Sequence, residues 1–253
     1  MSLATYGNRF HGTEFQSYAF SPASRYDWSR MHAAAMDRGF IDRAGNAVFD
    51  PADEPLKRAM DIVLTVMIIV ALSPALLLIA FMVRRDGGPA FFAHTRIGRN
   101  GEQFKCLKFR TMVMNADKVL ARLLEEDEEA RAEWERDFKL RNDPRITRLG
   151  RFLRTTSLDE LPQLFNVLRG EMSLVGPRPI VRDEVCRYGA AFHDYARCRP
   201  GITGAWQVSG RNDVSYTSRV KLDQDYAQFW SVGTDIAVLW KTVFVVIKRR
   251  GAY

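Results

Sequence analysis

The sequence contains few of the residues that build disulfide frameworks or metal centres. Its 253 residues include only three cysteines and four histidines. Cys106, Cys186 and Cys198 are an odd number without a CxxC spacing, and the histidines do not cluster. The sequence therefore favours a reducing compartment over a disulfide framework, and it indicates neither a thiolate nor a histidine zinc site.

The first 55 residues lack any sustained hydrophobic period of 2 or 3.6 residues. The first thirty of them contain no apolar segment of the kind found in signal peptides. We therefore expect residues 1–55 to form an N-terminal tail that is partly disordered. We also expect no cleaved signal peptide, with the bulk of the protein in the cytoplasm.

Charge is absent from Ile62 to Val83, a run of 22 residues. A helix of that length, at about 1.5 Å per residue, reaches about 33 Å, enough for a bilayer core of about 30 Å. Ser73-Pro74 stands at its centre. The proline predicts a bend, because it removes a backbone hydrogen bond and crowds the carbonyl of Val70, with Ser73 able to satisfy freed groups.

Both ends of this run are basic, with Lys57-Arg58 before it and Arg84-Arg85 after it. The positive-inside tendency is satisfied at both ends only when both stay in the cytoplasm. We therefore expect a re-entrant membrane helix over residues 56–86, broken at Ser73-Pro74, that enters one leaflet. A kinked helix that spans the bilayer is the alternative that these features leave open.

The remaining residues, 87–253, are expected to form one cytoplasmic domain. Loose alternation of aromatic residues from Ala90 to Met112, around Arg99-Asn100-Gly101, predicts a short β-hairpin. Apolar positions among charged ones from Asn115 to about Leu140 predict an amphipathic helix, with the acidic run Glu125–Glu129 on its solvated face. The fold class predicted is predominantly α with a small β-hairpin or sheet element, an α+β arrangement.

The apolar segment Ile236–Ile247 near the C-terminus is too short to span a bilayer and carries Lys241. It is expected to be a core helix or an amphipathic helix in the membrane interface, and we favour the interface.

The net charge of +7 indicates an acidic partner. Nucleic acid, an anionic lipid surface and a phosphorylated substrate all meet that condition. A nucleic-acid partner is not expected, since the sequence holds no recognisable recognition module and the 22-residue apolar run fits it poorly.

The segment from Thr147 to Pro179 is the densest in polar motifs. Arg148, Arg151 and Arg154 recur every three residues, which on a helix places them along one side. A guanidinium group can bind two phosphate oxygens at once, so this side of the helix is a candidate phosphate site. For Arg148 and Arg151 we favour a solvated or headgroup-facing basic stripe.

Ser157-Leu158-Asp159-Glu160 has two interpretations. The spacing Ser-x-x-Glu is that of a capping box, in which Glu160 reaches back to the amide of Ser157. Alternatively, Asp159 in a first helical turn is an ionised nucleophile toward phosphorus, with cations neutralising the incoming group. Glu160 is then the candidate ligand for Mg²⁺, which at phosphate sites takes one or two carboxylates.

Three further motifs follow, each with turn-forming residues and cations. They are Val175-Gly176-Pro177-Arg178-Pro179, Arg199-Pro200-Gly201-Ile202-Thr203-Gly204 and Gln207-Val208-Ser209-Gly210-Arg211-Asn212. Rigid loops that present arginines suit a diphosphate-containing ligand, because their side chains lose little freedom on binding. Such loops are equally compatible with a purely structural role.

Six motifs in this order resemble the bacterial polyprenyl-phosphate glycosyl-1-phosphate transferases, which begin exopolysaccharide and glycoconjugate assembly. The resemblance runs from about Lys57 to Gly251. The motifs are KRAMD with the Ser73-Pro74 run, KFRTM at 108–112, SLDELPQ at 157–163, VGPRP, RPGITG and QVSGRN. The chain is most similar to small members that use galactose 1-phosphate, and glucose 1-phosphate remains open. Residues 1–55 match no part of the catalytic core, no four-helix membrane bundle precedes that core, and His94 stands where glutamine is expected.

The resemblance implies a monotopic enzyme on the cytoplasmic face of the bacterial inner membrane. Asp159 would take hexose 1-phosphate from a UDP-hexose, releasing UMP, and undecaprenyl or another polyprenyl phosphate would then attack the phospho-enzyme. Glu160 would help to bind Mg²⁺. The substrate-binding residues implied are Arg154 and Arg178, with Arg199 as a further candidate and with Lys108, Arg110, Gln207 and Arg211 as weaker correspondences.

Two questions stay open at the level of sequence. The non-enzymatic alternative is a membrane-associated protein that binds phosphorylated ligands or anionic lipids through its cationic loops, without magnesium. The oligomeric state is also undecided, with a homo-oligomer among the alternatives.

Overall fold

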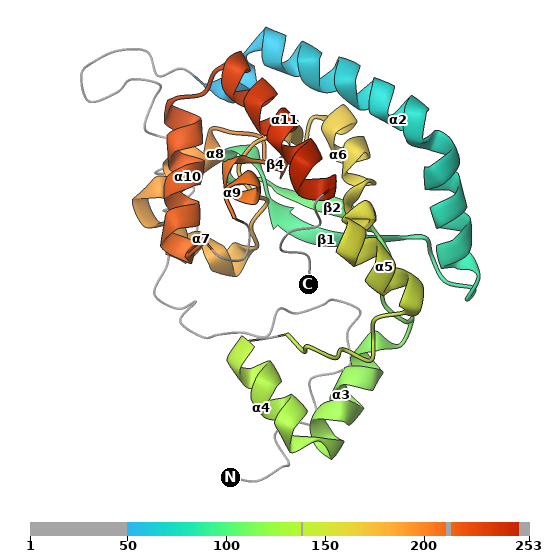
Figure 1. Cartoon of the computed structure of the whole chain (residues 1–253). Coiled ribbons are helices and arrows are strands. Elements are labelled where there is room, and N and C mark those ends of the chain that lie inside the picture. Colours follow the sequence, from blue (N-terminus) through green and yellow to red (C-terminus); the bar gives the residue numbers. More distant parts are fainter. Residues whose placement is uncertain (1–49, 138, 211–213, 248–253) are drawn as a thin grey trace.

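The computed structural model describes residues 50–137, 139–210 and 214–247. Within these ranges the fold is mostly helical with two small sheets, as the sequence predicted (Figure 1). The helices are α2 (Pro55–Arg84), α3 (Ala116–Glu126), α4 (Glu128–Asp137), α5 (Arg148–Thr156), α6 (Gln163–Arg169), α7 (Val185–Tyr188), α8 (Phe192–Ala196), α9 (Ala205–Val208), α10 (Tyr216–Gln228) and α11 (Val232–Ile247). The strands are β1 (Phe91–Ile97), β2 (Gln103–Phe109), β3 (Ser173–Val175) and β4 (Gly201–Thr203).

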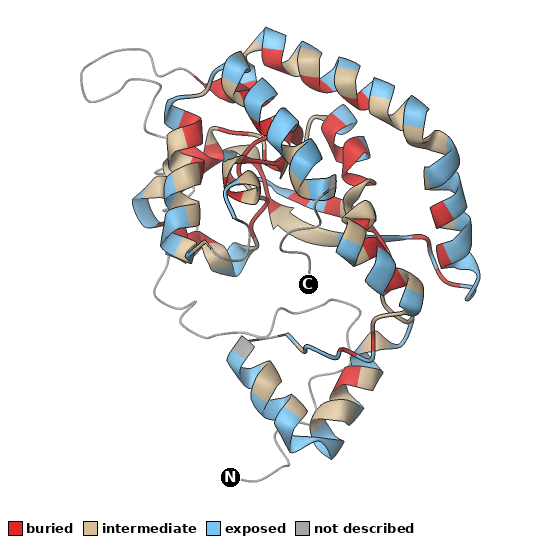
Figure 2. Ribbon diagram, viewed as in Figure 1, coloured by how far each residue is buried: buried red, intermediate tan, exposed pale blue. Residues whose placement is uncertain are grey.

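The long apolar segment forms a single 30-residue helix, α2, that continues through Pro74. Ser73 Oγ donates a 2.9 Å hydrogen bond to the carbonyl of Val70, which is the group that the proline leaves without its backbone partner. In Figure 1 the helix curves around the outside of the domain. Its outer face exposes large apolar side chains such as Leu77 and Phe81 (Figure 2), so α2 has a surface suited to lipid.

Both ends of α2 are fastened to the same domain. Near its start, Lys57 Nζ donates to the carbonyl of Val175 at 3.0 Å and pairs with Asp235 of α11 at 2.6 Å. Near its end, Arg110 donates to the carbonyl of Val83 at 2.9 Å. The 30-residue helix is therefore held to the same domain near both of its ends.

The predicted β-hairpin is confirmed, with β1 and β2 antiparallel and Phe91 opposite Phe109. Asn100 and Gly101 take positive φ values of 56° and 74° at the turn, which suits asparagine and glycine. Arg99 in the same turn pairs with Asp50 and Asp53. The folded part of the chain thus begins before residue 55, whereas most of the expected tail lies outside the described residues.

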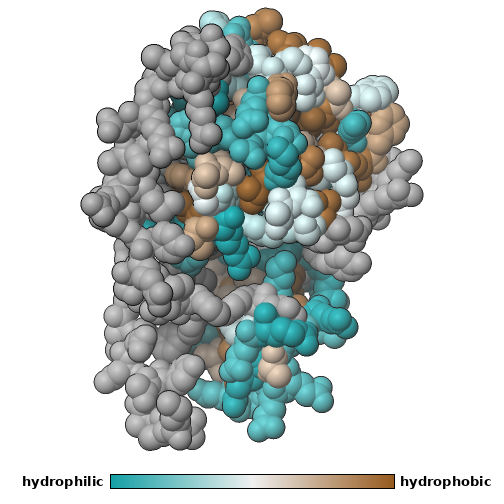
Figure 3. Space-filling view, turned by 90° about the vertical axis from the view of Figure 1, so that its left-hand side faces the viewer, coloured by the Kyte–Doolittle hydropathy of each residue, from teal (hydrophilic) through white to brown (hydrophobic). Residues whose placement is uncertain are grey.

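The single amphipathic helix expected between residues 115 and 140 is wrong. The chain makes two helices, α3 and α4, because Asp127 is extended (φ −127°, ψ 108°) and its side chain accepts from the amide of Ala130 in the first turn of α4. The acidic run Glu125–Glu129 is exposed, as expected, but it lies where α3 ends and α4 begins. Helices α3 and α4 together form the α3–α4 arm, which lies apart from the other elements in Figure 1. Hydrophilic side chains predominate in the lower part of Figure 3, where this arm lies.

Two of the proline-containing motifs lie side by side because β3 and β4 pair in parallel. The amide of Gly176 donates to the carbonyl of Thr203 at 3.0 Å, and the amide of Gly201 donates to the carbonyl of Pro177 at 2.8 Å. A β-carbon at Gly176 or Gly201 would collide with the backbone of the opposite loop. The glycines therefore allow the VGPRP and RPGITG motifs to approach each other closely.

The main core lies between the hairpin, α6, β3 and the C-terminal helices. Its buried members include Phe104, Leu164, Met172, Tyr226 and Val238. Helix α11 contributes Val238 to this core, while Ile236 and Trp240 are exposed on its other side. The segment predicted as either a core or an interfacial helix thus has one face in the protein core and one apolar face outside.

Candidate functional site

A sharp turn after α5 places the two candidate catalytic carboxylates. Thr147 caps α5 by accepting from the amide of Gly150 at 2.8 Å, and the helix ends at Ser157, whose φ of 58° is left-handed. A 3-10 turn, Leu158–Glu160, follows at once. The capping-box interpretation is wrong, because the Ser157 side chain caps no helix and Ser157 ends α5 instead.

Lys108 of β2 faces both carboxylates. Its Nζ atom lies 2.6 Å from Oε1 of Glu160 and 3.9 Å from Oδ2 of Asp159. Glu160 therefore bonds to a lysine on a distant strand, where a capping box would require the Ser157 amide. Asparagine 166 of α6 fixes this strand by accepting from the amide of Leu107 and donating to the carbonyl of Lys105. The sequence thus brings residues more than fifty positions apart into one charged group.

Asp159 is buried, with 8% of its surface exposed. Burial and, to a smaller extent, the negative charge of Glu160 raise the pKa of its carboxyl, the cations Lys108 and Arg154 oppose the shift, and the resulting pKa is about 6. Most of this carboxyl is therefore ionised at pH 7, yet it is poorly solvated. An anionic oxygen with little water around it is a suitable nucleophile for an electrophilic phosphorus atom.

Arg154 approaches the site from the last turn of α5. Its Nε atom donates to Oγ1 of Thr111 at 2.9 Å, and its charge acts on Asp159. Arg148 and Arg151, from the same predicted stripe, are exposed. Of the three arginines, Arg154 alone is placed beside the carboxylates, and this agrees with the preference for a solvated role for Arg148 and Arg151.

Arg178 lies in the VGPRP loop, with its guanidinium carbon 5.3 Å from the ring centre of Trp206. Its charge acts on the thiol of Cys106, on which Lys108 and Glu160 also act. The residues that follow Arg178 are bonded to β1, since Arg96 donates to the carbonyl of Pro179 at 3.3 Å and the amide of Ile97 donates to the carbonyl of Ile180 at 2.8 Å. Gln207 follows Trp206 in α9, and its buried Oε1 atom has no hydrogen-bond partner among the described residues.

Arg110 and Arg199 make contacts within the protein. Arg110 donates to both carboxylate oxygens of Asp86, at 2.5 and 2.8 Å, and to the carbonyls of Val83, Pro89 and Met112. Arg199 donates to the carbonyls of Gly170 and Ala52. The structure thus shows both guanidinium groups holding backbone segments together. Arg211 lies outside the described residues.

Within the described ranges, no cluster of three or more histidine, cysteine, aspartate or glutamate side chains gathers at one point. Asp159 and Glu160 are the two adjacent carboxylates at the candidate site. Two carboxylates suit a magnesium ion that completes its shell with phosphate oxygens and water. The donor set therefore fits an ion that arrives with a phosphorylated substrate.

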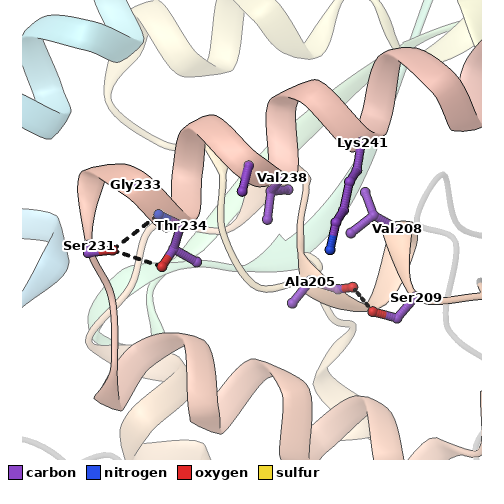
Figure 4. A pocket seen from close by; sticks show the side chains of 9 residues that line it. Ala205, Val208, Ser209, Ser231, Gly233, Thr234, Val238 and Lys241 are labelled. Carbon is purple, nitrogen blue, oxygen red and sulfur yellow. Dashed lines mark hydrogen bonds between the residues drawn. The ribbon is translucent and has the colours of Figure 1, made fainter.

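A shallow hollow of about 520 Å³ lies between α9 and α11, away from the carboxylates (Figure 4). Ser231, Thr234 and Lys241 supply its polar lining, and the Lys241 side chain extends toward α9. Ser231 already caps the amide of Thr234 at 3.1 Å. None of the predicted site residues lines this hollow.

Comparison with known families agrees with this geometry. The family model described as "Bacterial sugar transferase" matches residues 52–249, a range that includes every described residue except the first two. The chain belongs to this family. The matched range contains the Asp159-Glu160 turn, Lys108, both proline-containing loops and α2.

Individual relatives of this family member have known names. The chain is 59% identical over 198 residues to "Undecaprenyl-phosphate galactose phosphotransferase" of Salmonella typhimurium, covering 78% of this chain and 42% of the relative. It is 50% identical over 215 residues to "Exopolysaccharide production protein ExoY" of Rhizobium meliloti, covering 85% and 95%. It is 40% identical over 208 residues to "UDP-glucose:undecaprenyl-phosphate glucose-1-phosphate transferase" of Escherichia coli, covering 78% and 41%. The chain thus spans less than half the length of two of these relatives.

Sequence reasoning missed several residues that shape the site in this family member. Thr111 accepts a hydrogen bond from Arg154, and Asn166 holds β2 beside the Leu158–Glu160 turn. Trp206 makes a cation–π contact with Arg178. A second arginine, Arg219 of α10, also lies over Trp206. No local motif signals these contacts, since each joins elements that are distant in the sequence.

Proposed function

We propose that this chain transfers hexose 1-phosphate from a UDP-hexose, with galactose or glucose as the sugar, to undecaprenyl or another polyprenyl phosphate. The observation that carries the proposal is the buried Asp159 carboxylate beside Glu160, with Lys108 and Arg154 as neighbouring cations. Support also comes from the names of the relatives, which describe an undecaprenyl-phosphate galactose phosphotransferase, exopolysaccharide production and a UDP-glucose:undecaprenyl-phosphate glucose-1-phosphate transferase.

The proposed reaction has two displacements at one phosphorus atom. A carboxylate oxygen of Asp159 attacks the sugar-bearing phosphorus of the donor, a P–O bond to the uridine phosphate breaks, and UMP leaves. A phosphate oxygen of the polyprenyl acceptor then attacks the same phosphorus, and the bond to Asp159 breaks. Asp159 is regenerated, and the sugar remains on a polyprenyl diphosphate.

The cations of the site have a defined electrostatic part in this proposal. Lys108 and Arg154 lie where negative charge accumulates as phosphate approaches a carboxylate, so they lower the cost of bringing two anions together. Mg²⁺ is proposed as the cofactor, with Glu160 as the residue that would help to hold it, and there it would neutralise phosphate charge.

We further propose that α2 is re-entrant and that the chain is monotopic, at the cytoplasmic face of the bacterial inner membrane. The supporting observation is that Lys57, at one end of α2, and Val83, at the other, both contact the same domain. A membrane-spanning helix would place its two ends on opposite sides of the bilayer. Inner-membrane lipids are then partners, and a lipid acceptor is reached from the cytoplasm.

The decisive experiment is UMP release from a panel of UDP-sugars by the detergent-solubilised full chain, with polyprenyl phosphate and magnesium. Lipid-dependent UMP from one UDP-hexose, abolished by EDTA and by Asp159→Asn, is the expected result and names the sugar. Well-folded protein that yields no UMP from any sugar would overturn the enzymatic proposal and favour a non-catalytic ligand-binding protein.

A further inference from the structure

Two arginines from different elements lie over the indole ring of Trp206. The guanidinium carbon of Arg178, in the VGPRP loop, lies 5.3 Å from the indole centre, and that of Arg219, in α10, lies 4.5 Å from it. The indole is buried, with 6% of the residue exposed. Stacking on an aromatic ring fixes a planar guanidinium group and leaves its N–H donors in the ring plane free for other partners.

Within the part of the chain that the structure describes, neither arginine takes part in an ion pair. Over the described ranges, no carboxylate lies within 4.0 Å of either guanidinium group, in contrast to Arg110 and Arg145, which have carboxylate partners at 2.5 and 2.7 Å. The Nε atom of Arg219 donates a long hydrogen bond, 3.3 Å, to the carbonyl of Val214. Both groups are half-buried and keep donors for an external anion.

Asp223 is a carboxylate on which the charges of both arginines act, but its hydrogen bonds are made to other groups. Its Oδ2 atom accepts from the hydroxyl of Tyr188 at 2.7 Å, and it also binds the backbone amide of Arg178. Burial raises the pKa of this carboxyl to about 7, so a substantial fraction is neutral at pH 7. The charges of Arg178 and Arg219 act on Asp223 and lower this pKa, but the Asp223 carboxylate lies more than 4.0 Å from both guanidinium groups.

The pair is also joined to the catalytic turn. The thiol of Cys106 lies on β2, two residues before Lys108, and the charges of Lys108, Glu160 and Arg178 all act on it. Alternate residues of a strand lie on one face, so Cys106 and Lys108 point to the same side of the hairpin. The segment that follows Arg178 is bonded to this hairpin, since Arg96 of β1 donates to the carbonyl of Pro179 at 3.3 Å and the amide of Ile97 donates to the carbonyl of Ile180 at 2.8 Å. The hairpin that places Lys108 beside Asp159 therefore also holds the loop of Arg178.

We propose that Arg219 and Arg178, both stacked on Trp206, bind a phosphate group of the substrates as one arginine pair. This inference rests on the proposed function and adds Arg219 as a binding residue that no motif indicated. The phosphate belongs either to the nucleotide that leaves as UMP or to the lipid acceptor. Both sources share the chemistry of a phosphate ester with at least two unprotonated oxygens available to guanidinium donors.

Binding of UMP to the full detergent-solubilised chain, measured by calorimetry, tests the pair without requiring turnover. Arg219→Gln removes one positive charge, and Arg122→Gln, on the exposed face of the α3–α4 arm, is the matched control. Loss of a charge-assisted hydrogen bond predicts a UMP dissociation constant raised about tenfold or more in Arg219→Gln alone. Uridine, which lacks the phosphate, is expected to bind both variants equally.

A second variant and a second ligand keep the test sharp. Arg219→Lys keeps the charge and loses the planar stack, so an intermediate loss is expected. Unchanged UMP affinity with a raised KM for polyprenyl phosphate would assign the pair to the acceptor. Equal UMP affinity and equal KM values in Arg219→Gln and Arg122→Gln, with both variants folded, would overturn the inference. Wild-type chain that binds UMP through Arg219 but releases none from any UDP-sugar would instead contradict the proposed function.

Discussion

The ammonium group of Lys108 donates a 2.6 Å hydrogen bond to Oε1 of Glu160. The same group lies 3.9 Å from Asp159, so one cation on β2 controls the electrostatics of two neighbouring carboxylates. Its bond to Glu160 holds that side chain to one side of Asp159. A buried carboxylate is thus left with one oxygen-rich neighbour and two cations around it, which is the arrangement that phosphoryl transfer to aspartate requires.

Asp159→Asn is expected to abolish turnover while leaving the fold intact. The amide has nearly the shape of the carboxyl, yet it cannot form the acyl phosphate. UMP release should fall by at least about a thousandfold, since covalent catalysis is lost. Circular dichroism and the thermal unfolding midpoint serve as folding controls. Detectable wild-type rates in this variant would remove Asp159 from the mechanism.

The pH dependence of kcat/KM should report the carboxyl of Asp159. Its pKa is raised to about 6 by burial, so the nucleophilic anion predominates above that pH and is lost below it. The rate is therefore expected to be level from about pH 7 upward and to fall tenfold per unit as the pH drops below about 6. A profile that is level down to pH 4.5 would contradict an essential carboxylate with this pKa.

Two substitutions should move that acid limb in opposite directions. Lys108 lowers the pKa of Asp159 and Glu160 raises it. Residual activity of Lys108→Met should therefore have its limb at higher pH than wild type, and that of Glu160→Gln at lower pH. Rates from pH 4.5 to 8 at constant ionic strength measure both. Limbs that shift in the same direction would show that another group titrates.

The sequence predicted those parts of the fold that depend on local chemistry. Asn100-Gly101 indicates a hairpin turn because these residues tolerate positive φ, and Ser73 indicates its own bond to Val70 because the proline beside it frees that carbonyl. The helix pattern after residue 115 was misinterpreted at Asp127. An aspartate inside an acidic run gives no periodic signal when its side chain caps the next helix.

The parts that depend on long-range packing were out of reach. Ser157-x-x-Glu160 satisfies a capping motif, and only the position of Lys108 on β2 shows that Glu160 has another partner. The parallel pairing of β3 with β4, which brings two arginine loops together, has no signature in strands of three residues. Arg219 lies in an ordinary charged helix and acquires its role from Trp206 alone.

Arg110 is expected to contribute more to stability than to substrate binding. Its guanidinium group joins Asp86 and the last turn of α2 to the end of β2 through the bonds described above. Arg110→Lys keeps the charge but loses the paired geometry, so we expect a loss of about 1–3 kcal/mol in unfolding free energy. Thermal unfolding and the KM for UDP-hexose distinguish the roles, with the exposed Arg122→Lys as control. A raised KM at unchanged stability would instead favour direct binding.

The re-entrant topology predicts that both ends of α2 are labelled from the cytoplasm. Single cysteines at Leu56 and Arg85, which are exposed, can be introduced after Cys186, the exposed native cysteine, is replaced by serine. In wild-type background both should react from the cytoplasmic side only. The double change Ser73→Ala with Pro74→Ala restores a regular helix and is expected to let a fraction of molecules span the bilayer. Periplasmic labelling at one end of the unaltered helix would contradict re-entry.

Breaking the buried pair of Lys57 and Asp235 should cost far more stability than breaking a surface pair of the same residue types. Both side chains are at most 4% exposed, and Asp235 also accepts from the hydroxyl of Tyr226 at 2.8 Å. Asp235→Asn leaves the ammonium group buried without its counter-charge, so a loss of about 3–5 kcal/mol is expected. Asp225→Asn, which breaks the exposed pair with Lys221 at 2.8 Å, should cost no more than about 0.5 kcal/mol. Denaturant unfolding of the two variants in the same detergent compares them directly. Similar losses of unfolding free energy in the two variants would mean that apolar contacts hold the start of α2 to α11 and that the ion pair adds little.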